Sequence, residues 1–205
     1  MMKVSIIKIA LVSLFAFNCS LFTASAQSAK YVLDKAASTV TAASGVKAHF
    51  RMTTTTGSTS GTIAIKGKKF YATTNQAKVW FDGKTQWTYL KNNDEVNVSN
   101  PTEAQLQAIN PYNFINLYKR GYTYTMNTAG TNYVVHLTAN SPSKKISEVF
   151  ITVNKKSYQP MQVKMLQGKK WTTFDITSLK KENIADSQFR FNSKDFPKAE
   201  IIDLR

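Results

Sequence analysis

Two histidines are the side chains in this sequence best suited to acid–base catalysis. A serine hydrolase needs such a base beside a nucleophile, but neither His49 nor His136 lies in a nucleophile motif, and no Gly-x-Ser-x-Gly occurs. His49 falls on the polar side of an alternating segment, and His136 alternates out from Val135 and Leu137. We therefore interpret both histidines as surface residues.

Paired carboxylates, as used by glycoside hydrolases, have five candidates here: Asp82, Asp94, Glu95, Asp175 and Asp186. The first three lie in predicted turns, and no two of the five clearly share an inward face. The sequence also contains no Gly-rich phosphate loop and no paired metal-ligand spacing. We therefore expect a protein that is not an enzyme and that uses no metal and no cofactor. A hydrolase that depends on one of the two histidines is an alternative.

The first 26 residues have the three parts of a secretory signal peptide. Lys3 and Lys8 give a basic start, Ile9 to Phe17 form an apolar run, and Ala24-Ser25-Ala26 is a small-x-small cleavage site. The apolar run falls short of the ~20 residues that a membrane span needs. We expect cleavage after Ala26 and a periplasmic protein. A membrane anchor and lipid modification of Cys19 are the alternatives.

Composition favours one exported domain, residues 27–205. The length suits a single domain, and 42% hydrophobic residues supply a sizeable core. One cysteine excludes a disulfide scaffold. The formal net charge is +15, of which the leader contributes two charges. Such a protein meets an anionic membrane surface or an acidic partner, and export argues against nucleic acid as a partner.

Most of the lysines fall in predicted hairpin turns. They include Lys66, Lys68, Lys69, Lys144, Lys145, Lys155, Lys156, Lys169, Lys170, Lys180 and Lys181. One interpretation is that they are solvated turn residues that keep strand edges from aggregating. The other is a basic rim that meets a membrane or an acidic partner.

From Val46 onward the apolar residues alternate with a period of two. About ten or eleven short antiparallel strands result, mostly 8–12 residues apart, which predicts a barrel or a sandwich. The last of these strands contains Phe189 and Phe191, and residues 195–205 are expected to form an extended tail. The sequence therefore predicts a mainly β protein.

Two segments have helical patterns instead. Ser28 to Ala43 has one apolar stripe at helical spacing and predicts an amphipathic helix before the first strand. Pro101 to Gly121 predicts two short helices broken at Pro111. The second of these is too apolar for a solvated helix, since it contains Tyr112, Phe114, Ile115, Leu117 and Tyr118.

The most specific stretch is Phe81-Asp82-Gly83-Lys84-Thr85-Gln86-Trp87-Thr88-Tyr89. It resembles the Asp-Gly-Lys-Thr-x-Trp-x-Tyr hairpin of the periplasmic lipoprotein carrier family LolA. The surrounding order is similar as well: a first helix, the strand at Val46 to Phe50, the proline-marked segment at 110–114, and an end like Phe189-Arg190-Phe191 and Ile201-Ile202-Asp203.

This resemblance implies an open, incomplete antiparallel β-barrel with an α-helical lid, whose helices cover an apolar concave face. It implies a monomeric chaperone that binds the acyl chains of lipoproteins. An inner-membrane ABC-type lipoprotein exporter would load it, and an outer-membrane acceptor would receive the cargo. Where the family often has an Arg-Pro that is implicated in holding the lid closed, this sequence has Lys66-Gly67-Lys68-Lys69, so Lys68 becomes the candidate lid contact.

Apolar and aromatic side chains on the predicted strands are the candidate lining of an acyl-chain cavity, because aromatics and methionines make an adaptable apolar pocket. They are Phe50, Ile63, Ile65, Phe70, Trp80, Trp87, Tyr89, Tyr122, Tyr124, Met161 and Met165. The candidate lid residues are Tyr112, Phe114, Ile115, Leu117 and Tyr118. An ordinary barrel core explains any one of the lining residues equally well.

Release of the cargo limits how deep such a cavity can be. A fully buried ~16-carbon chain contributes about 12 kcal/mol at ~0.8 kcal/mol per methylene. Two or three such chains would bind too tightly to hand over, so a lid that packs into the empty cavity is expected. A periplasmic carrier of free lipid with the same fold is the main alternative, and a structural envelope protein is another.

Overall fold

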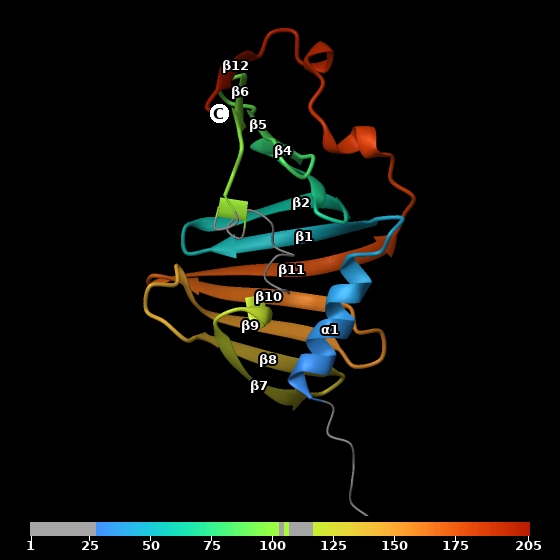
Figure 1. Cartoon of the computed structure of the whole chain (residues 1–205), viewed down its shortest axis with the longest axis vertical. Helices are drawn as coiled ribbons and strands as arrows, with labels where there is room; N and C mark the ends of the chain where they lie inside the picture. The colour runs from blue at the N-terminus through green and yellow to red at the C-terminus, as the bar shows by residue number, and fades with distance from the viewer. Residues whose placement is uncertain (1–27, 103–104, 107–116) are drawn as a thin grey trace, which may run out of the picture.

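A single sheet of twelve strands makes up most of the protein (Figure 1). The computed structural model describes residues 28–102, 105–106 and 117–205. The strands follow the order β12-β6-β5-β4-β3-β2-β1-β11-β10-β9-β8-β7. The elements are α1 (Ala29–Val40), β1 (Val46–Thr54), β2 (Gly57–Lys66), β3 (Lys69–Thr74), β4 (Ala77–Phe81), β5 (Gln86–Leu90), β6 (Glu95–Ser99), β7 (Tyr122–Ala129), β8 (Asn132–Ala139), β9 (Ile146–Asn154), β10 (Pro160–Gln167), β11 (Lys170–Lys181), η2 (Asp186–Phe189), η3 (Ser193–Asp195) and β12 (Glu200–Asp203).

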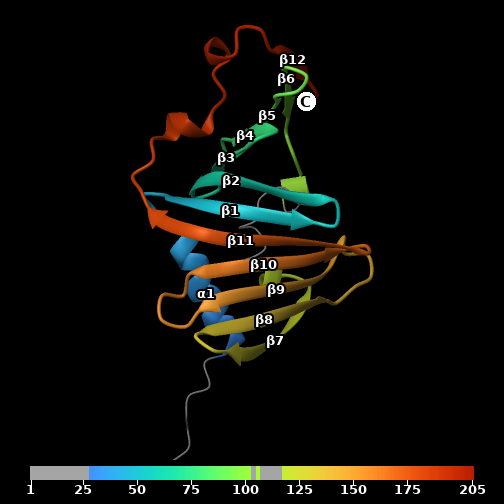
Figure 2. The same ribbon diagram turned by 180° about the vertical axis from the view of Figure 1, so that it is seen from behind.

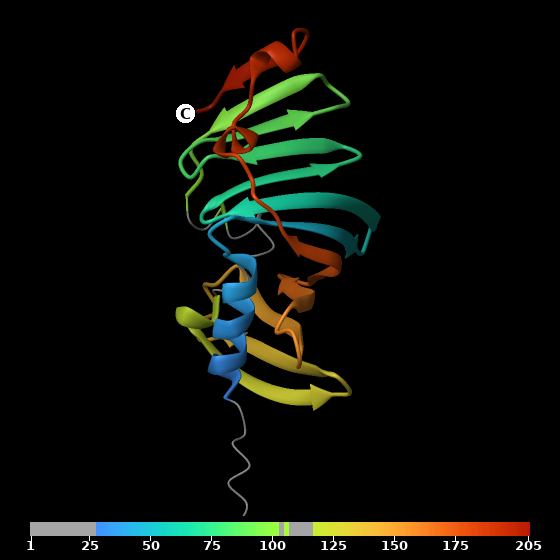
Figure 3. The same ribbon diagram turned by 90° about the vertical axis from the view of Figure 1, so that its right-hand side faces the viewer.

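The sheet is an open one, because β7 and β12 end it without meeting. Hairpins connect β1 to β6 in one half and β7 to β11 in the other, and β1 pairs with β11 to join the halves. The sheet twists so strongly that strands β7–β11 are seen face-on in Figure 1 and strands β2–β6 in Figure 3. The predicted open, incomplete antiparallel barrel is confirmed, with twelve strands rather than ten or eleven.

The first helix forms where its apolar stripe predicted it. The Ser28 side chain caps the N-terminus by accepting a hydrogen bond from the backbone N–H of Tyr31. The helix ends at Val40, and Gly45 follows with φ +108°, which suits glycine. The stripe packs on the sheet and is buried: Val32, Leu33, Ala36, Ala37 and Val40. Figure 1 shows α1 lying across the β7–β11 half, and in Figure 2, seen from behind, the strands lie in front of α1.

The two faces of the sheet carry separate apolar clusters. The face toward α1, called the α1 face here, holds the larger cluster, with side chains from both halves of the sheet. The opposite face holds a smaller one of Ala64, Ile184 and Phe189, with Tyr71 packed against it. In β2 the switch is visible residue by residue, because Ile63 and Ile65 join the first cluster and Ala64 the second.

The C-terminal segment, residues 184–199, covers the opposite face of the β2–β6 half (Figure 3). The predicted strand at Phe189 and Phe191 is wrong, since Phe189 ends the 3-10 helix η2 and Phe191 lies in a loop. The two rings alternate because both pack on the sheet, and no ladder forms there. The tail is only partly extended: Glu200–Asp203 form β12, which pairs parallel to β6.

Lysines of the β2–β3 turn bind this segment. The Lys66 ammonium donates a hydrogen bond to the Ile184 carbonyl at 2.9 Å and lies 3.0 Å from a carboxylate oxygen of Asp186. The Lys69 ammonium donates to the other Asp186 oxygen at 2.7 Å. These ion pairs are partly exposed, so burial of Phe189 contributes more to holding the segment.

Replacing Phe189 by alanine is expected to detach the C-terminal segment. The ring is fully buried, so its loss should reduce the free energy of unfolding by about 3–5 kcal/mol. Urea denaturation measures that loss, and limited proteolysis should show faster cleavage within residues 184–199. Lys194→Ala, at an exposed position of the same segment, is the control, and equal protease resistance of the two variants would contradict this assignment.

Candidate functional site

The α1 face is the candidate binding surface, because it gathers most of the apolar residues proposed to line a cavity. Seven of the eleven lie there: Phe50, Ile63, Ile65, Phe70, Tyr122, Tyr124 and Met165. Six of these are buried, and Tyr124 is half-buried. The face is therefore closed in this structure, and a ligand would have to displace what covers it.

Three aromatic candidates lie on the opposite face. The strand register pairs Trp80 with Trp87 and with Tyr71, and Tyr89 with Lys78. Directly paired residues share a face, so all of them point toward the C-terminal segment. Trp80 contacts the rings of Phe191 and Phe196, with ring centroids 5.5 and 5.6 Å apart.

Met161, the eleventh candidate, is 41% exposed. It lies where the β9–β10 register shifts between Pro160 and Gln162. Because of this shift, Met161 does not share a face with Val163 and Met165, although the three positions alternate in the sequence. The bulge turns its side chain away from the apolar cluster.

The sequence pattern missed several residues of the α1 face. Phe174 packs against Phe50 with ring centroids 6.2 Å apart. Alternation along β8, β9 and β11 was the signal that could have found this set: Val135, Leu137, Val149, Ile151, Val153, Phe174 and Ile176.

Of the five candidate lid residues, two can be placed. Tyr112, Phe114 and Ile115 lie outside the described residues. Leu117 and Tyr118 are both 5% exposed and belong to the α1-face cluster. They form a 3-10 turn with Lys119, just before β7. The cover of the α1 face thus includes this turn as well as α1.

A hydrogen bond connects the turn to α1. The Tyr118 hydroxyl donates to a carboxylate oxygen of Asp34, and the Lys30 ammonium donates to the other oxygen at 2.7 Å. Both hydrogen bonds lower the pKa of Asp34 below its ordinary value, and the bond from Lys30 has the larger effect. Burial, and then the bond to Asp34, raise the pKa of the Tyr118 hydroxyl, which stays protonated and able to donate.

The Asp-Gly-Lys-Thr stretch forms the loop of the β4–β5 hairpin. The loop spans four residues, 82–85. The Asp82 carboxylate accepts hydrogen bonds from the backbone N–H groups of Lys84 and Thr85, at 3.0 and 2.9 Å. The Thr85 hydroxyl donates to the Asn100 side chain at 3.0 Å, so the loop also holds the chain just after β6.

The family of the chain follows from its sequence over most of this fold. The family model described as "Outer membrane lipoprotein carrier protein LolA" matches residues 19–169. The chain belongs to the LolA family. Comparison with the curated proteins gives no match. Membership points to a lipid- or lipoprotein-binding protein of the cell envelope rather than to an enzyme.

Comparison with solved structures supports the fold. An uncharacterised conserved protein from Thermus thermophilus is similar with a TM-score of 0.59 and 13% identity, over 86% of this chain and 99% of that one. A LolA superfamily protein from Nitrosomonas europaea gives a TM-score of 0.43 and 12% identity, over 80% of this chain and 97% of that one. The support for the fold comes from the first of these two.

Lys68, the candidate lid contact of this LolA-like chain, is exposed in the β2–β3 turn. Its neighbours Lys66 and Lys69 bind the C-terminal segment on the opposite face, as described above. A contact between Lys68 and the lid stays a prediction, since most of the lid lies outside the described residues.

The two histidines lie on the face away from α1. His49 is exposed, and the ring of His136 stacks on Phe150 with centroids 4.1 Å apart. A ring nitrogen of His136 lies 2.9 Å from a carboxylate oxygen of Glu148. The Thr177 hydroxyl donates to the backbone carbonyl of His49 and not to its ring, so no hydroxyl or thiol of the described residues is seen to hydrogen-bond either imidazole. Among the described residues, no three His, Cys, Asp or Glu side chains are grouped to hold a metal ion, and no described helix is long and apolar enough to span a membrane.

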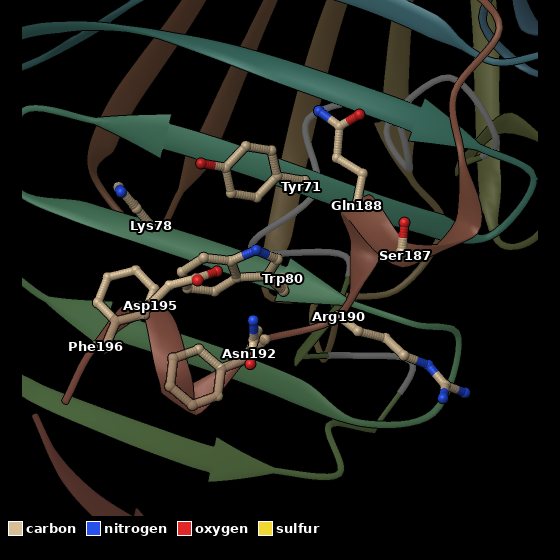
Figure 4. Close-up of a pocket in the computed structure, with 10 residues that line it drawn as sticks. Tyr71, Lys78, Trp80, Ser187, Gln188, Arg190, Asn192, Asp195 and Phe196 are labelled. Atoms are coloured by element: carbon tan, nitrogen blue, oxygen red, sulfur yellow. The ribbon is translucent and has the colours of Figure 1, made fainter.

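A pocket of about 640 Å³ lies between the β3–β4 strands and the C-terminal segment (Figure 4). Aromatic rings form its floor, and polar side chains of the segment surround its mouth. Its lining consists of Tyr71, Lys78, Trp80, Ser187, Gln188, Arg190, Phe191, Asn192, Asp195 and Phe196. It is separate from the α1 face, because the sheet lies between them.

Acidification is expected to loosen the contact between α1 and residues 117–119. Because the pKa of Asp34 is lowered, its carboxylate stabilises the folded contact above the ordinary value of 3.8, and this stabilisation is lost as the pH falls through the lowered pKa. The protection factors of the amides of residues 117–119, which correct for the pH dependence of intrinsic exchange, should therefore fall below about pH 4.

Asp34→Asn provides the control for this prediction. An asparagine side chain still accepts the hydrogen bond from Tyr118 but does not titrate. The variant should lack the acid-induced step in hydrogen exchange. A step of the same size in both proteins would show that another group is responsible.

Proposed function

We propose that this protein is a periplasmic carrier that binds the acyl chains of lipoproteins against the α1 face and moves them from the inner to the outer membrane. The observation that carries the proposal is the continuous apolar cluster on this face, covered by a separate helix and turn, in a chain of the LolA family. An inner-membrane ABC-type exporter and an outer-membrane acceptor are its expected partners.

Binding on this face must exchange one apolar contact for another. The side chains of Phe50, Phe70 and Met165 are at most 8% exposed, so the cargo-free face is already covered. An acyl chain that enters takes the place of the cover and exposes the cover's own apolar side chains. The net affinity is the difference between two burial energies, and this difference keeps the cargo releasable.

The hydrogen bond between Tyr118 and Asp34 joins the two parts of the cover that the structure describes. Tyr118 also packs its ring edge-on against Tyr124, with centroids 6.2 Å apart. Movement of the turn would therefore uncover Tyr124, which is already half-buried. We place the entry of the acyl chain beside this pair.

Photocrosslinking tests which face holds the cargo. A benzophenone amino acid in place of Tyr124, on the α1 face, should crosslink to the N-terminal acylated cysteine of a co-expressed lipoprotein. The same label at Trp87, on the opposite face, is the matched control and should give no such product.

The cargo itself is tested in the same experiment. A lipoprotein whose acylated cysteine is replaced should lose the crosslink at position 124. Crosslinks to free phospholipid alone would favour a carrier of free lipid on the same fold. Crosslinks at position 87 but not at 124 would contradict the α1 face as the site.

Leu117→Asp is expected to weaken the cover. The side chain is 5% exposed, and burying a carboxylate there would reduce the free energy of unfolding by about 3 kcal/mol or more unless the turn swings out. We expect the turn to swing out and an apolar dye to bind more strongly. Thr123→Asp, at an exposed position of β7, is the control and should leave dye binding unchanged.

A further inference from the structure

Positive charge is concentrated in one half of the sheet. Residues 28–45 and 117–181, which form α1 and β7–β11, contain thirteen Lys and Arg against the three acids Asp34, Glu148 and Asp175. Residues 46–102 and 182–205, which form β1–β6, the C-terminal segment and β12, contain twelve basic against eight acidic residues. Most of the net charge of these residues therefore belongs to α1 and the β7–β11 half, and the carrier function proposed above does not explain it.

Within that half, three connections bring cations to one edge. Lys119 and Arg120 precede β7, Lys144 and Lys145 lie between β8 and β9, Lys169 lies between β10 and β11, and Lys170 begins β11. Adjacent antiparallel strands place these connections at the same ends, on the left in Figure 1. All six side chains are exposed, and residues 117–121, 140–145 and 168–170, which carry them, contain no acid. We call these six residues the basic rim.

The basic rim borders the candidate cargo face. The Lys119 ammonium lies over the ring of Tyr118, 5.7 Å from its centroid, and the Lys144 ammonium lies over the ring of Tyr122 at 5.6 Å. Both tyrosines are buried members of the α1-face cluster. At a lipid surface, charged headgroups lie next to acyl chains. Cations at the margin of an apolar face could therefore contact the headgroups while the apolar face lies beside the acyl chains.

We propose that the basic rim docks this protein on an anionic lipid surface through the headgroup phosphates. This inference rests on the proposed function for its purpose, because docking would bring the α1 face to the membrane where cargo enters or leaves. The rim would hold the protein on the surface reversibly, with the cargo-free protein already competent to bind.

The composition of the rim favours a lipid surface over an acidic protein. Five of its six cations are lysines, which are depleted from protein interfaces and serve as point charges without a preferred geometry. Protein interfaces instead rely on buried aromatic or arginine anchors. The large apolar side chains recorded as exposed in the described chain are Tyr31, Met161, Ile201 and Leu204, and none is in these connections.

Electrostatic docking of this kind has a known scale. Each lysine near an anionic membrane contributes about 1 kcal/mol, and 1.4 kcal/mol is a factor of ten in the binding constant. Removing three rim charges should therefore weaken binding about 100-fold. The attraction should also vanish in ~1 M salt, where the screening length is about 3 Å.

Vesicle cosedimentation of the purified, cargo-free processed protein tests the proposal. The wild type should bind vesicles that contain phosphatidylglycerol and should not bind vesicles of phosphatidylcholine alone. The rim variant K145Q/K169Q/K170Q should lose about 100-fold in partitioning.

The control variant is K156Q/K180Q/K181Q. It removes three exposed lysines at the opposite ends of the same strands, so its net charge equals that of the rim variant. It should bind within a few-fold of the wild type. Equal losses in the two variants would overturn the proposal, because net charge alone would then explain binding. Failure of the wild type to prefer anionic vesicles would overturn it too, and would leave an acidic protein as the rim's partner.

Comparing vesicle binding with crosslinking at position 124 separates this inference from the proposed function. Crosslinking of an acylated lipoprotein at position 124 is measured in solution without vesicles. Loss of that crosslink with intact vesicle binding would remove the carrier function and leave the rim. An intact crosslink with no vesicle binding would remove the rim and leave the carrier function. Thermal unfolding checks that all variants remain folded.

Discussion

An open sheet with apolar side chains on both faces cannot remain in water unless each face is covered, and the rest of this structure depends on that constraint. A closed barrel needs one core, but here β7 and β12 end the sheet without pairing. The chain supplies two different covers. The α1 helix and the turn at 117–119 pack on one face, and the C-terminal segment packs on the other.

The two covers are attached in different ways, which suggests different duties. The C-terminal segment is held by a fully buried ring at Phe189, by Lys66 and Lys69, and by the parallel pairing of β12 with β6. Its removal would disrupt backbone hydrogen bonds of the sheet. Among the residues that the structure describes, the α1 cover forms no strand pairing with the sheet, and a side-chain hydrogen bond joins its helix to the turn. The C-terminal cover is thus built as a permanent part of the sheet, whereas the α1 cover is the one that can be displaced without breaking the sheet.

The sequence predicted the open β architecture and the first helix, because long stretches of two-residue and helical periodicity reflect burial on one side. It placed Phe50, Ile63, Ile65 and Phe70 on a common face, as the structure has them. It could not place Trp80, Trp87 and Tyr89. In β3 and β4 two aromatic residues are adjacent, Phe70-Tyr71 and Trp80-Phe81, and both faces there are covered. Alternation carries no information where both faces are apolar, and only the strand register decides.

The prediction for the C-terminal segment was wrong for a related reason. Phe189 and Phe191 alternate as a strand would, but their spacing serves packing on a sheet built from residues more than a hundred positions earlier. The short run Glu200–Asp203 forms a strand because the edge of β6 is available for parallel pairing. Long-range partners decide the structure of this segment, and periodicity within it does not reveal them.

The displaceable cover has a size suited to exchange with an acyl chain. The α1 stripe contains three larger apolar side chains, Val32, Leu33 and Val40, and two alanines. At about 1.5–3 kcal/mol for each larger side chain, exposing the stripe costs roughly 5–9 kcal/mol. One ~16-carbon chain gains about 12 kcal/mol when fully buried, so the stripe is of the same order as one such chain. A longer apolar stripe would exclude the cargo, and a weaker one would leave the face exposed or the cargo trapped. In the proposed exchange, the two alanines at the centre of the stripe would have two roles, because they keep the helix close to the sheet and limit what its departure costs.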